Sequence, residues 1–584
     1  MKLLLCLPIF FISLPFSYSC NSKEKNTLLQ IKKHFNSRPL FSSWDPQTDC
    51  CTSWDGVECT NGRVTLLSIA KDDNLVGPIP DQIGDLLELN TLDMSFLNLT
   101  GNIPRAITKL KHLDFIFLKW NRLSGPIPDY ISELKNVTFI DLSYNKFTGP
   151  VPGWLTQMPK LQTFQIDNNS LTGPIPNSFG SFVGNVPNLF LKNNKLSGQI
   201  PDQIGDLLEL RGLSFNYLPH LNGNIPRTIT KLKNLELFII RHTNLSGPIP
   251  DNIGELKKVT FLDLSDNKLT GPIPGSLSQM PKLENIILER NKLTGSVPNS
   301  FGSFVGKVPD LSLSNNKLSG QIPDQIGDLL DLRVISFNYL SHLTGNIPRT
   351  ITKLKNLELF IIRHCNLSGP IPDYIGELKN VTFLDLSYNN FTGPIPGSLS
   401  QMPMIQDIIL NHNKLTGSIP NSFGSFVGNV PDLYLANNKL SGNQYYCFNI
   451  FNFLIITLGK IPESLSKNNF NVVDLSKNSF TGDGSMFFGG NKPSSTAYDL
   501  SRNMFEFDLS KVKFDENILD LDLSHNRIFG NLPKELTGLS LRLFNVSYNR
   551  LCGKIPRGGK LQTFEQYEFA HNRCLCGPPL KKAC

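Results

Sequence analysis

Residues 113–128 read LDFIFLKWNRLSGPIP, and residues 137–152 repeat the same pattern as VTFIDLSYNKFTGPVP. Two earlier copies of the pattern start near residues 64 and 89. Later copies, usually 24 or 25 residues apart, start near residues 161, 186, 210, 235, 259, 283, 308, 332, 357, 381, 405 and 430, and looser ones near 470, 495, 518 and 541. The chain therefore holds 20 repeats. A period of this length indicates coils that stack on one another and bury a continuous core that no single repeat could form.

The residues within one repeat predict how a coil is built. Alternating apolar residues point inward and the residues between them face solvent, as in a β-strand with one buried side. The asparagine that follows can bond backbone groups of adjacent turns, and Gly-x-Ile-Pro turns the chain. The pattern LxxLxLxxNxLxGxIP resembles the plant-type leucine-rich repeat. We therefore predict an α/β solenoid, a right-handed superhelix of 24-residue repeats with a parallel β-sheet on its concave face.

A longer period divides the solenoid into blocks. The segment DQIGDLLEL at residue 81 recurs at residue 202, and again at residue 324 as DQIGDLLDL. Five repeats fill each interval, which indicates tandem copying of a five-repeat unit. We expect a signal peptide at 1–19, an N-terminal cap at 20–63, repeats over 64–556 and a C-terminal cap at 557–584. The blocks are 81–201, 202–323 and 324–442, and an insertion occupies 443–459.

The first residues are typical of a secretory signal. Lys2 precedes an apolar core, LLLCLPIFFISLPF, and Ser17-Tyr18-Ser19 resembles a small-x-small cleavage site. Pro8 and Pro15 argue against a buried helix there. Loss of Lys2 lowers the formal charge from +7 to +6.

Charge and motifs exclude several function classes. Charged residues make up 18% of the chain, and no dense Lys/Arg cluster or basic helix favours nucleic-acid binding. The nine histidines lie in variable repeat positions or caps. We find no nucleophile elbow, phosphate loop or metal-ligand spacing, so we predict neither an enzyme nor a cofactor.

Cysteines lie at the two ends of the solenoid, where terminal modules must cover the exposed core. In an oxidising compartment disulfides would fasten those modules. We predict the pairs Cys20–Cys50, Cys51–Cys59, Cys552–Cys574 and Cys576–Cys584, although spacing alone leaves other connectivities open. Zinc sites are disfavoured because companion histidines are lacking. Cys365 replaces the repeat asparagine, where we expect a buried thiol, and Cys447 lies in the insertion.

The caps and last repeats resemble one family. Residues 545–579, NVSYNRLCGKIPRGGKLQTFEQYEFAHNRCLCGPPL, look very like the C-terminal cap of plant polygalacturonase-inhibiting proteins. Residues 499–514, 421–435 and 28–35 resemble that family too. The WDGVEC of the first cap is closer to a flower-associated branch. Family members usually have about ten repeats, so two extra five-repeat blocks are present here.

The resemblance implies a secreted plant cell-wall (apoplast) protein of plant defence, peripheral to the plasma membrane at most. Such proteins bind fungal or insect polygalacturonase through the concave sheet and obstruct the cleft that takes up pectin. Pectin and receptor-like proteins are further partners, and no transmembrane segment is expected. The alternative is an extracellular protein that binds a peptide or receptor complex in signalling or floral development.

We predict that the partner contacts exposed positions of the concave sheet in all three blocks. These positions are Asp93, Phe117, Lys119, Trp120, Asp141, Tyr144, Gln165 and Asp167 in the first block, Arg241, His242, Asp263, Asp266, Glu289 and Arg290 in the second, and Arg363, His364, Asp385, Tyr388 and His412, with Asn411, in the third.

Acidic residues of adjacent middle repeats contribute to the contact in the family. By motif, this role falls on Asp141 and Asp167, because an acidic patch would complement a basic cleft. The second block repeats the pair as Asp263 and Glu289, whereas the third has Asp385 followed by Asn411. We therefore expect the first two blocks to bind better than the third. An aspartate at such a position can equally do no more than solvate the sheet.

Sequons mark candidate glycosylation sites at Asn98, Asn136, Asn244, Asn366, Asn380, Asn390 and Asn545. Asn168 also lies in a sequon, but on the concave face, where a glycan would obstruct binding.

The insertion, residues 443–459, interrupts the corner of one repeat. Without it, Ser441-Gly442 would join Lys460-Ile461-Pro462 in register. Its apolar run is too short for a membrane span. We favour an interruption, either intron sequence read through in frame or a gene-model error. The alternative is a genuine extruded loop.

Overall fold

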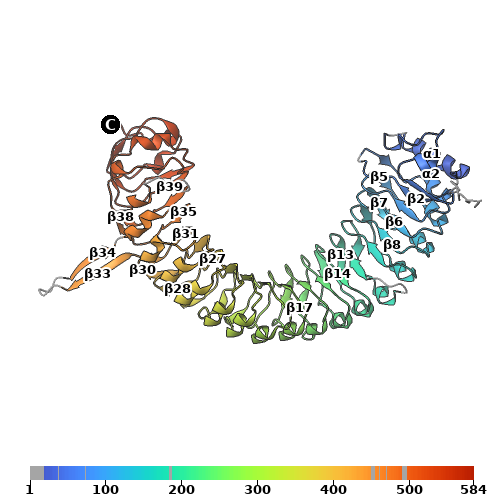
Figure 1. The fold of residues 1–584 in the computed structure, drawn as a ribbon, viewed down its shortest axis with the longest axis horizontal. Helices are drawn as coiled ribbons and strands as arrows, with labels where there is room; N and C mark the ends of the chain where they lie inside the picture. The colour runs from blue at the N-terminus through green and yellow to red at the C-terminus, as the bar shows by residue number, and fades with distance from the viewer. Residues whose placement is uncertain are drawn as a thin grey trace, which may run out of the picture. The chain divides into compact units, whose positions relative to one another are not determined.

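The computed structural model describes residues 19–36, 39–72, 74–182, 187–448, 454–459, 461–468, 470–488 and 496–584. The expected signal peptide lies outside these residues except for Ser19. The chain forms two compact units, unit 1 (Met1–Leu245) and unit 2 (Ser246–Cys584). In both, short strands alternate with turns and single-turn helices, one coil after another (Figure 1).

Unit 1 has a main sheet to which each repeat contributes one short strand, paired in parallel with the strand of the next repeat. The exception is β1, which pairs with β2 antiparallel and begins the sheet in the cap. The main-sheet strands of unit 1 are β1 (Val57–Thr60), β2 (Arg63–Ser68), β4 (Thr91–Asp93), β6 (Phe115–Phe117), β8 (Phe139–Asp141), β10 (Thr163–Gln165), β12 (Asn188–Phe190), β14 (Gly212–Ser214) and β16 (Leu237–Ile239).

Unit 2 continues the same plan with parallel strands in matching register. Its main-sheet strands are β18 (Phe261–Asp263), β20 (Asn285–Ile287), β21 (Asp310–Ser312), β23 (Val334–Ser336), β25 (Leu359–Ile361), β27 (Phe383–Asp385), β29 (Asp407–Ile409), β31 (Asp432–Tyr434), β35 (Val472–Asp474), β37 (Ala497–Asp499), β39 (Asp520–Asp522) and β41 (Leu543–Asn545). Every repeat predicted from the sequence has its strand, so the solenoid prediction is confirmed.

The coil at residues 137–160 shows why the pattern folds in this way. The middle residue of β8, Ile140, is buried together with Leu142, Phe147, Val151 and Leu155. The first and third strand residues face the other side of the sheet, because successive side chains of a strand alternate. The repeat leucines and isoleucines thus form one core that runs through the stacked coils.

The repeat asparagine links each coil to the one before it. The Asn121 amide donates to the carbonyl of Met94 at 2.7 Å and to that of Leu118 at 3.1 Å, and its oxygen accepts from the Leu99 backbone N–H at 3.0 Å. Asn145 and Asn169 bond in the same way. These bonds satisfy backbone groups that the turn would otherwise bury without partners.

The asparagine ladder is interrupted at corresponding places in the two units. Leu218 and Leu340 take the asparagine position of their repeats, and a one-residue-longer turn lets the N–H of Leu221 or Leu343 bond back within its own coil. The following repeat then needs no asparagine oxygen, and it carries Thr243 or Cys365 instead. Cys365 is buried, as expected, and its thiol donates to the Phe337 carbonyl. Burial raises the pKa of that thiol to about 12, which makes it unreactive.

Corner strands pair in smaller parallel sheets on a second face. In unit 1 they are β3 (Val76–Gly77), β5 (Asn98–Gly101), β7 (Arg122–Pro126), β9 (Lys146–Thr148), β11 (Thr172–Gly173), β13 (Lys195–Gln199) and β15 (His220–Asn222). In unit 2 they are β17 (Ser246–Pro248), β19 (Lys268–Thr270), β22 (Ser319–Gln321), β24 (His342–Thr344), β26 (Ser368–Pro370), β28 (Asn390–Gly393), β30 (Lys414–Gly417), β32 (Lys439–Leu440), β36 (Thr481–Gly482), β38 (Met504–Phe505), β40 (Phe529–Gly530), β42 (Arg550–Lys554) and β43 (Cys574–Cys576).

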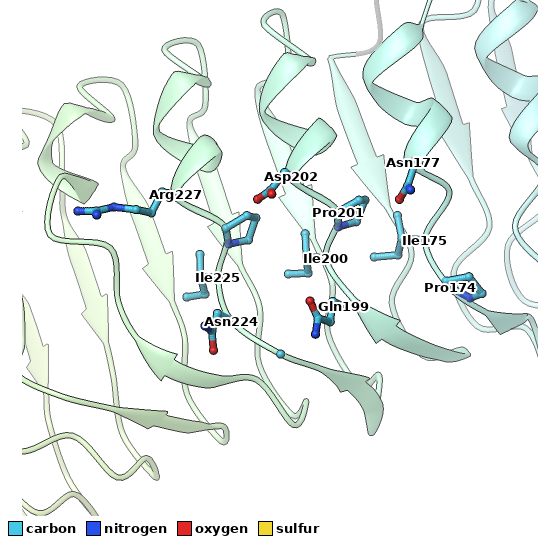
Figure 2. Close-up of a pocket in the computed structure, with 12 residues that line it drawn as sticks. Pro174, Ile175, Asn177, Gln199, Ile200, Pro201, Asp202, Asn224, Ile225 and Arg227 are labelled. Atoms are coloured by element: carbon cyan, nitrogen blue, oxygen red, sulfur yellow. The ribbon is translucent and has the colours of Figure 1, made fainter.

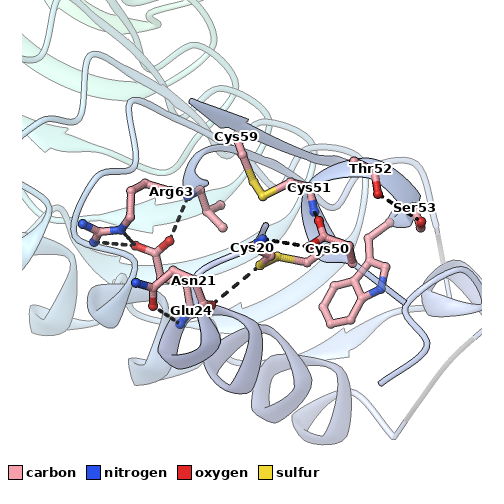
Figure 3. The surroundings of a disulfide bond; sticks show 12 residues. Cys20, Asn21, Glu24, Cys50, Cys51, Thr52, Ser53, Cys59 and Arg63 are labelled. Atoms are coloured by element: carbon pink, nitrogen blue, oxygen red, sulfur yellow. Dashed lines mark hydrogen bonds and ion pairs between the residues drawn. A yellow bond between two sulfur atoms is a disulfide. The ribbon is translucent and has the colours of Figure 1, made fainter. Parts of the chain in front are cut away.

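The N-terminal cap packs α1 (Ser22–His34) and α2 (Cys50–Ser53) against the first strands (Figure 3). Asn21 caps α1 by accepting from the backbone N–H groups of Lys23 and Glu24. The buried Glu24 carboxylate accepts from the Arg63 guanidinium at 2.7 Å and from the Val64 N–H at 2.9 Å. This charge pair ties the cap helix to β2.

Disulfides fasten both ends. They join Cys20 to Cys50, Cys51 to Cys59, Cys552 to Cys574 and Cys576 to Cys584, the pairs that the sequence analysis predicts. The sulfur atoms of Cys20, Cys50 and Cys51 cluster, but all three are in disulfides, so they offer no thiolate to a metal. Within the described ranges, no helix has the length and apolarity needed to cross a membrane.

The insertion forms an antiparallel hairpin of β33 (Gly442–Phe448) and β34 (Leu454–Gly459), while its tip lies outside the described residues. The hairpin does not disturb the pairing of the flanking coils, because β31 still pairs with β35 through Leu433 and Val473. Asn478 still accepts from the Leu440 N–H across the insertion. The core therefore continues from the coil before the insertion to the coil after it.

Candidate binding surface

Three positions of each repeat reach the solvent side of the main sheet. Two are the first and third residues of the strand, as with Phe115 and Phe117 in β6. The third position is the residue before the repeat asparagine. This residue has a left-handed backbone, as at Trp120 with φ +54°. Because every coil places these residues alike, side chains of successive repeats meet in rows.

An aromatic surface covers three consecutive repeats of unit 1. We use this name for Phe96, Phe115, Phe117, Trp120, Phe139 and Tyr144. Trp120 stacks on Tyr144 with ring centres 3.9 Å apart and lies parallel to Phe96 at 6.0 Å. On the strands, Phe117 contacts Phe139 at 5.0 Å. Trp120 is 47% exposed and Phe96 36%. Large aromatic groups held rigidly in solvent are typical of contact surfaces.

Half of this surface is absent from the sequence-based prediction. Trp120, Phe117 and Tyr144 were predicted, whereas Phe96, Phe115 and Phe139 were not. The signal was available: Phe115 and Phe139 precede a buried isoleucine by one residue and so must share a face with the residue that follows it. Phe96 holds the same repeat position as Trp120.

The expectation that Asp141, Asp263 and Asp385 are exposed is wrong, because they are only 1, 2 and 3% exposed. The Asp141 carboxylate accepts from the backbone N–H of Ser143 at 3.0 Å and from its hydroxyl at 2.6 Å. Corresponding bonds to serine form at Asp263 and Asp385.

A cation of the preceding coil also covers the carboxylates of Asp141 and Asp385. Lys119 Nζ lies 3.5 Å from the Asp141 carboxylate, and Arg363 lies 3.8 Å from that of Asp385. These aspartates therefore hold the turn after the strand and present little free charge to a partner.

Asp167 is placed differently from these aspartates. Its strand β10 ends in Gln165, and Asp167 occupies the position that Ser143 holds one repeat earlier. It is half-buried, and its carboxylate accepts from the Lys192 backbone N–H at 2.8 Å. Burial raises the pKa of Asp167 to about 6, and the charge of Asp141 adds to the increase. The predicted acid pair is thus adjacent, but only Asp167 has a carboxylate that is not enclosed by its own turn.

Three predicted residues of the third block, His364, Tyr388 and His412, form a second row of rings in unit 2 together with Tyr339, which was not predicted. Tyr339, His364, Tyr388 and His412 stack at successive centre distances of 4.4, 3.9 and 4.0 Å. The His412 ring also bonds the Asn437 amide at 2.5 Å. Burial lowers the pKa of both histidines, so their rings are predominantly neutral near pH 7.

The other predicted residues lie on the main-sheet face in smaller groups. In unit 1, Arg241 donates to the Tyr217 hydroxyl at 2.9 Å, and the His242 ring meets the Tyr217 ring edge-on. In unit 2, Arg290 pairs with Asp266 at 3.4 Å. The remaining members are Asp93 and Gln165 at third strand positions, Glu289, which accepts from Ser312, and Asn411.

The three blocks differ at part of the aromatic surface. The positions of Phe115, Phe117 and Trp120 hold Leu237, Ile239 and His242 one block later, and Leu359, Ile361 and His364 one block after that. The rings at these three positions are therefore not copied, whereas the position of Phe139 keeps Phe261 and Phe383, and that of Phe96 holds Tyr217 and Tyr339.

An acidic row in unit 2 was also missed. Asp474, Asp499 and Asp522 are the third residues of β35, β37 and β39. Burial raises the pKa of Asp474 and of Asp522, and repulsion from Asp499 adds to both increases. These looser repeats lie outside the three blocks that contain the predicted contact residues.

The sequon asparagines differ in their surroundings. Asn136 and Asn380 are at the surface and donate to carbonyls of the preceding coil. The side-chain nitrogen of Asn168, by contrast, is buried without a partner in the described part of the chain. Asn545 ends β41 on the main-sheet face, where its oxygen accepts from Ser547.

Comparison with known proteins agrees with this architecture. The leucine-rich-repeat N-terminal domain model matches residues 21–60. The leucine-rich-repeat model matches eight segments between residues 136 and 539.

The chain is 66% identical over 257 residues to the leucine-rich repeat protein FLOR 1 of Arabidopsis thaliana, an alignment that covers 44% of this chain and 73% of that protein. It is 54% identical over 254 residues to the polygalacturonase inhibitor of Vitis vinifera, which covers 44% of this chain and 71% of the inhibitor. The chain belongs to this family of plant leucine-rich-repeat proteins. As a member of the polygalacturonase-inhibitor and FLOR 1 family, it is a binding protein rather than an enzyme.

Solved structures of plant receptors align with a larger share of this chain than FLOR 1 and the inhibitor do. The ectodomain of the receptor kinase HAESA, in complex with the peptide hormone IDA and the co-receptor SERK1, covers 96% of this chain with a TM-score of 0.63 and 27% identity. The TDR receptor covers 87% with a TM-score of 0.69 and 25% identity. The inhibitor relatives thus match less than half of this chain, whereas the receptor ectodomains match most of it.

Proposed function

We propose that this protein is a secreted inhibitor of pathogen polygalacturonases in the plant cell wall. The observation that carries the proposal is the aromatic surface of unit 1, in a chain that shares half or more of its aligned residues with a polygalacturonase inhibitor. Its rings are held by stacking and so lose little conformational freedom on binding. A protein seated on this surface would cover it and exclude water from the ring faces.

The surrounding charges suit a target with a basic cleft. A cleft that takes up anionic polygalacturonate is expected to be basic, and Asp167 lies on the main-sheet face beside the Asp141 turn. An ionised Asp167 would pair with a cation at the rim of that cleft and fix the register of docking. We assign the electrostatic role to Asp167 because Ser143 and Lys119 already engage Asp141. Occlusion of the cleft would then block pectin from the enzyme.

Inhibition of a panel of fungal and insect polygalacturonases tests the proposal. The secreted full-length protein should bind at least one of them and reduce its release of reducing sugars from pectin. Trp120→Ala should weaken that inhibition by at least about 10-fold, as expected for a central aromatic contact. Tyr567→Ala is the matched control, since Tyr567 is an exposed ring in the C-terminal cap. Failure to bind any enzyme of the panel would contradict the proposal.

A receptor-type role is the second candidate, and the extent of the structural match favours it. The HAESA ectodomain aligns over 99% of its own length with this chain, whereas the inhibitor relatives align with less than half of it. In that case the protein would bind an extracellular peptide or a receptor complex. Binding to a secreted peptide, with no effect on any polygalacturonase, would favour this role.

A further inference from the structure

We propose that each unit carries, on its corner face, a groove that binds a neutral, extended, hydroxyl-rich glycan chain. The groove of unit 1 has a volume of about 550 Å³ and crosses three successive coils between the corner strands and the single-turn helices that follow (Figure 2). It lies on a face formed by other residues than those of the aromatic surface, so this site is separate from the proposed inhibitory contact.

The chemistry of the lining points to sugar hydroxyl groups. The exposed polar side chains are the amides of Asn177, Gln199 and Asn224, the carboxylate of Asp202 and the guanidinium of Arg227. An amide group offers both hydrogen-bond donors and an acceptor. It therefore suits sugar hydroxyl groups, which also donate and accept hydrogen bonds. The exposed Pro174 ring gives a flat C–H surface for the face of a pyranose. Asp202 and Arg227 balance in charge, which favours a neutral chain over a polyanion.

The spacing of the coils suits a linear polymer. Gln199 and Asn224 hold the same position, directly before Ile-Pro, in neighbouring coils. Paired strands lie about 4.8 Å apart, so the groove repeats its polar group once per strand spacing. That step is close to the length that one pyranose unit adds to an extended 1,4-linked chain. A peptide is a poorer fit, since the floor of isoleucines is closed and offers no side-chain pocket.

A local sequence change creates the groove. Many other corners carry proline before Ile-Pro, for example Pro126 and Pro248. Gln199 instead lies over the next coil at Gly223, where an added Cβ would come within 2.6 Å of its Cγ. The left-handed φ of +78° at Gly223 also favours glycine.

Unit 2 repeats the arrangement one block later. Its groove, of about 680 Å³, is lined by Asn299, Gln321, Asp324 and Asn346. Ser296 stands in place of Pro174, and the second groove has the larger volume. Gln321 again lies over a glycine, Gly345, with a left-handed φ of +84°. The two grooves would give one molecule two glycan sites.

Proline substitution gives a test that preserves the fold, because proline already occupies this position in neighbouring coils. The full-length chain and a variant with Gln199→Pro, Asn224→Pro, Gln321→Pro and Asn346→Pro are titrated with soluble neutral xylan, with hydroxyethylcellulose and with polygalacturonate. We expect the wild type to bind a neutral polymer and the variant to bind it at least 10-fold more weakly, equivalent to about 1.4 kcal/mol. Substitution in one unit alone should remove one of two sites.

Asn102→Pro is the matched control. Asn102 begins an Asn-Ile-Pro-Arg corner like that of Asn224, but the coil before it carries Pro78 in place of glutamine. This variant should bind the neutral polymer like the wild type. The proposal is overturned if the four-residue variant keeps wild-type binding, or if the wild type binds polygalacturonate alone. Polygalacturonase inhibition should be unchanged in the variant, so the two proposals fail separately.

Discussion

At the scale of single residues, the Asx-type turn after the strand decides which charges a partner can meet. Asp141 bonds both the backbone and the hydroxyl of Ser143 while almost fully buried. Asn545 makes the same two bonds to Ser547 in the last repeat. The turn therefore requires an acceptor oxygen rather than a negative charge.

This equivalence predicts different outcomes for two substitutions at Asp141. Asp141→Asn should retain the turn and change the free energy of unfolding little. Asp141→Ala should cost about 1–3 kcal/mol, because it leaves buried donors of Ser143 without an acceptor. Urea unfolding of both variants measures this. Equal destabilisation by Asn and Ala would show that the charge itself matters.

Asp167 predicts a dependence of stability on pH. Its folded pKa of about 6 lies above the ordinary value for aspartate. Between these values the folded state holds more protons than the unfolded state, so the stability contribution present below the unfolded pKa is lost as pH rises through the folded pKa. The loss should be about 1–3 kcal/mol between pH 4 and 7, with allowance for the partial exposure of the group.

Asp167→Asn cannot ionise and still offers an oxygen to the Lys192 N–H. Relative to the wild type, it should therefore gain stability as pH rises from 4 to 7. Denaturant midpoints at several pH values provide the comparison. A difference between the two proteins that does not change with pH would contradict the raised pKa.

At the scale of elements, each coil is held mainly by its neighbours. The β33–β34 hairpin leaves the adjacent strands paired and the asparagine ladder intact across it. Deletion of residues 443–459 should therefore change the free energy of unfolding by less than about 1 kcal/mol, as for a surface change outside the core.

Thermal unfolding of the deletion variant against the full chain checks this prediction. Destabilisation by several kcal/mol would show that the hairpin is part of the packed structure. Whether the secreted protein contains the segment is a separate question. Mass spectrometry would detect a peptide spanning Leu440 to Lys460 if it is present, and such a peptide would exclude a gene-model error.

The interrupted ladder gives a second prediction at this scale. Asn389 donates to the carbonyls of Ile362 and Leu386 and accepts from the Leu367 N–H, whereas Cys365 has no such N–H to satisfy. Asn389→Ala should cost about 2–3 kcal/mol through unpaired buried groups. Cys365→Thr should be nearly neutral, since Thr243 holds the matching place. Urea unfolding compares them, and a larger cost at Cys365 would contradict the account.

The elements could be predicted largely from the sequence, because one period fixes strand, ladder and corner together. The rows of side chains could not, since they depend on the neighbouring coil. Lys119 covers Asp141 from the preceding repeat, and the left-handed backbone at Trp120 sets its stacking on Tyr144. The corner groove likewise requires two adjacent coils to carry amides. Single-repeat patterns contain none of this information.

At the scale of the whole molecule, caps protect the ends of a chain of nearest-neighbour contacts. Cys552 and Cys574 join paired strands β42 and β43 at the C-terminal end. Replacing both with serine should destabilise the last coils by about 2–4 kcal/mol. The stability of unit 1 should not change.

Hydrogen exchange resolves this locally. Amides of residues 543–576 should exchange faster in the double-serine variant, while those of residues 91–141 keep their wild-type rates. Uniformly faster exchange throughout the chain would contradict the nearest-neighbour description.

Block duplication lengthened the chain without copying Phe115, Phe117 and Trp120, so inhibition is expected to depend on the first block. The most direct test measures the dissociation constant for a bound polygalacturonase with Trp120→Ala, His242→Ala and His364→Ala, which remove the same repeat position from the three blocks. We predict that Trp120→Ala weakens binding by at least about 10-fold and that each histidine variant changes it by less than about 3-fold. Equal losses for all three variants, or none for Trp120→Ala, would contradict the account.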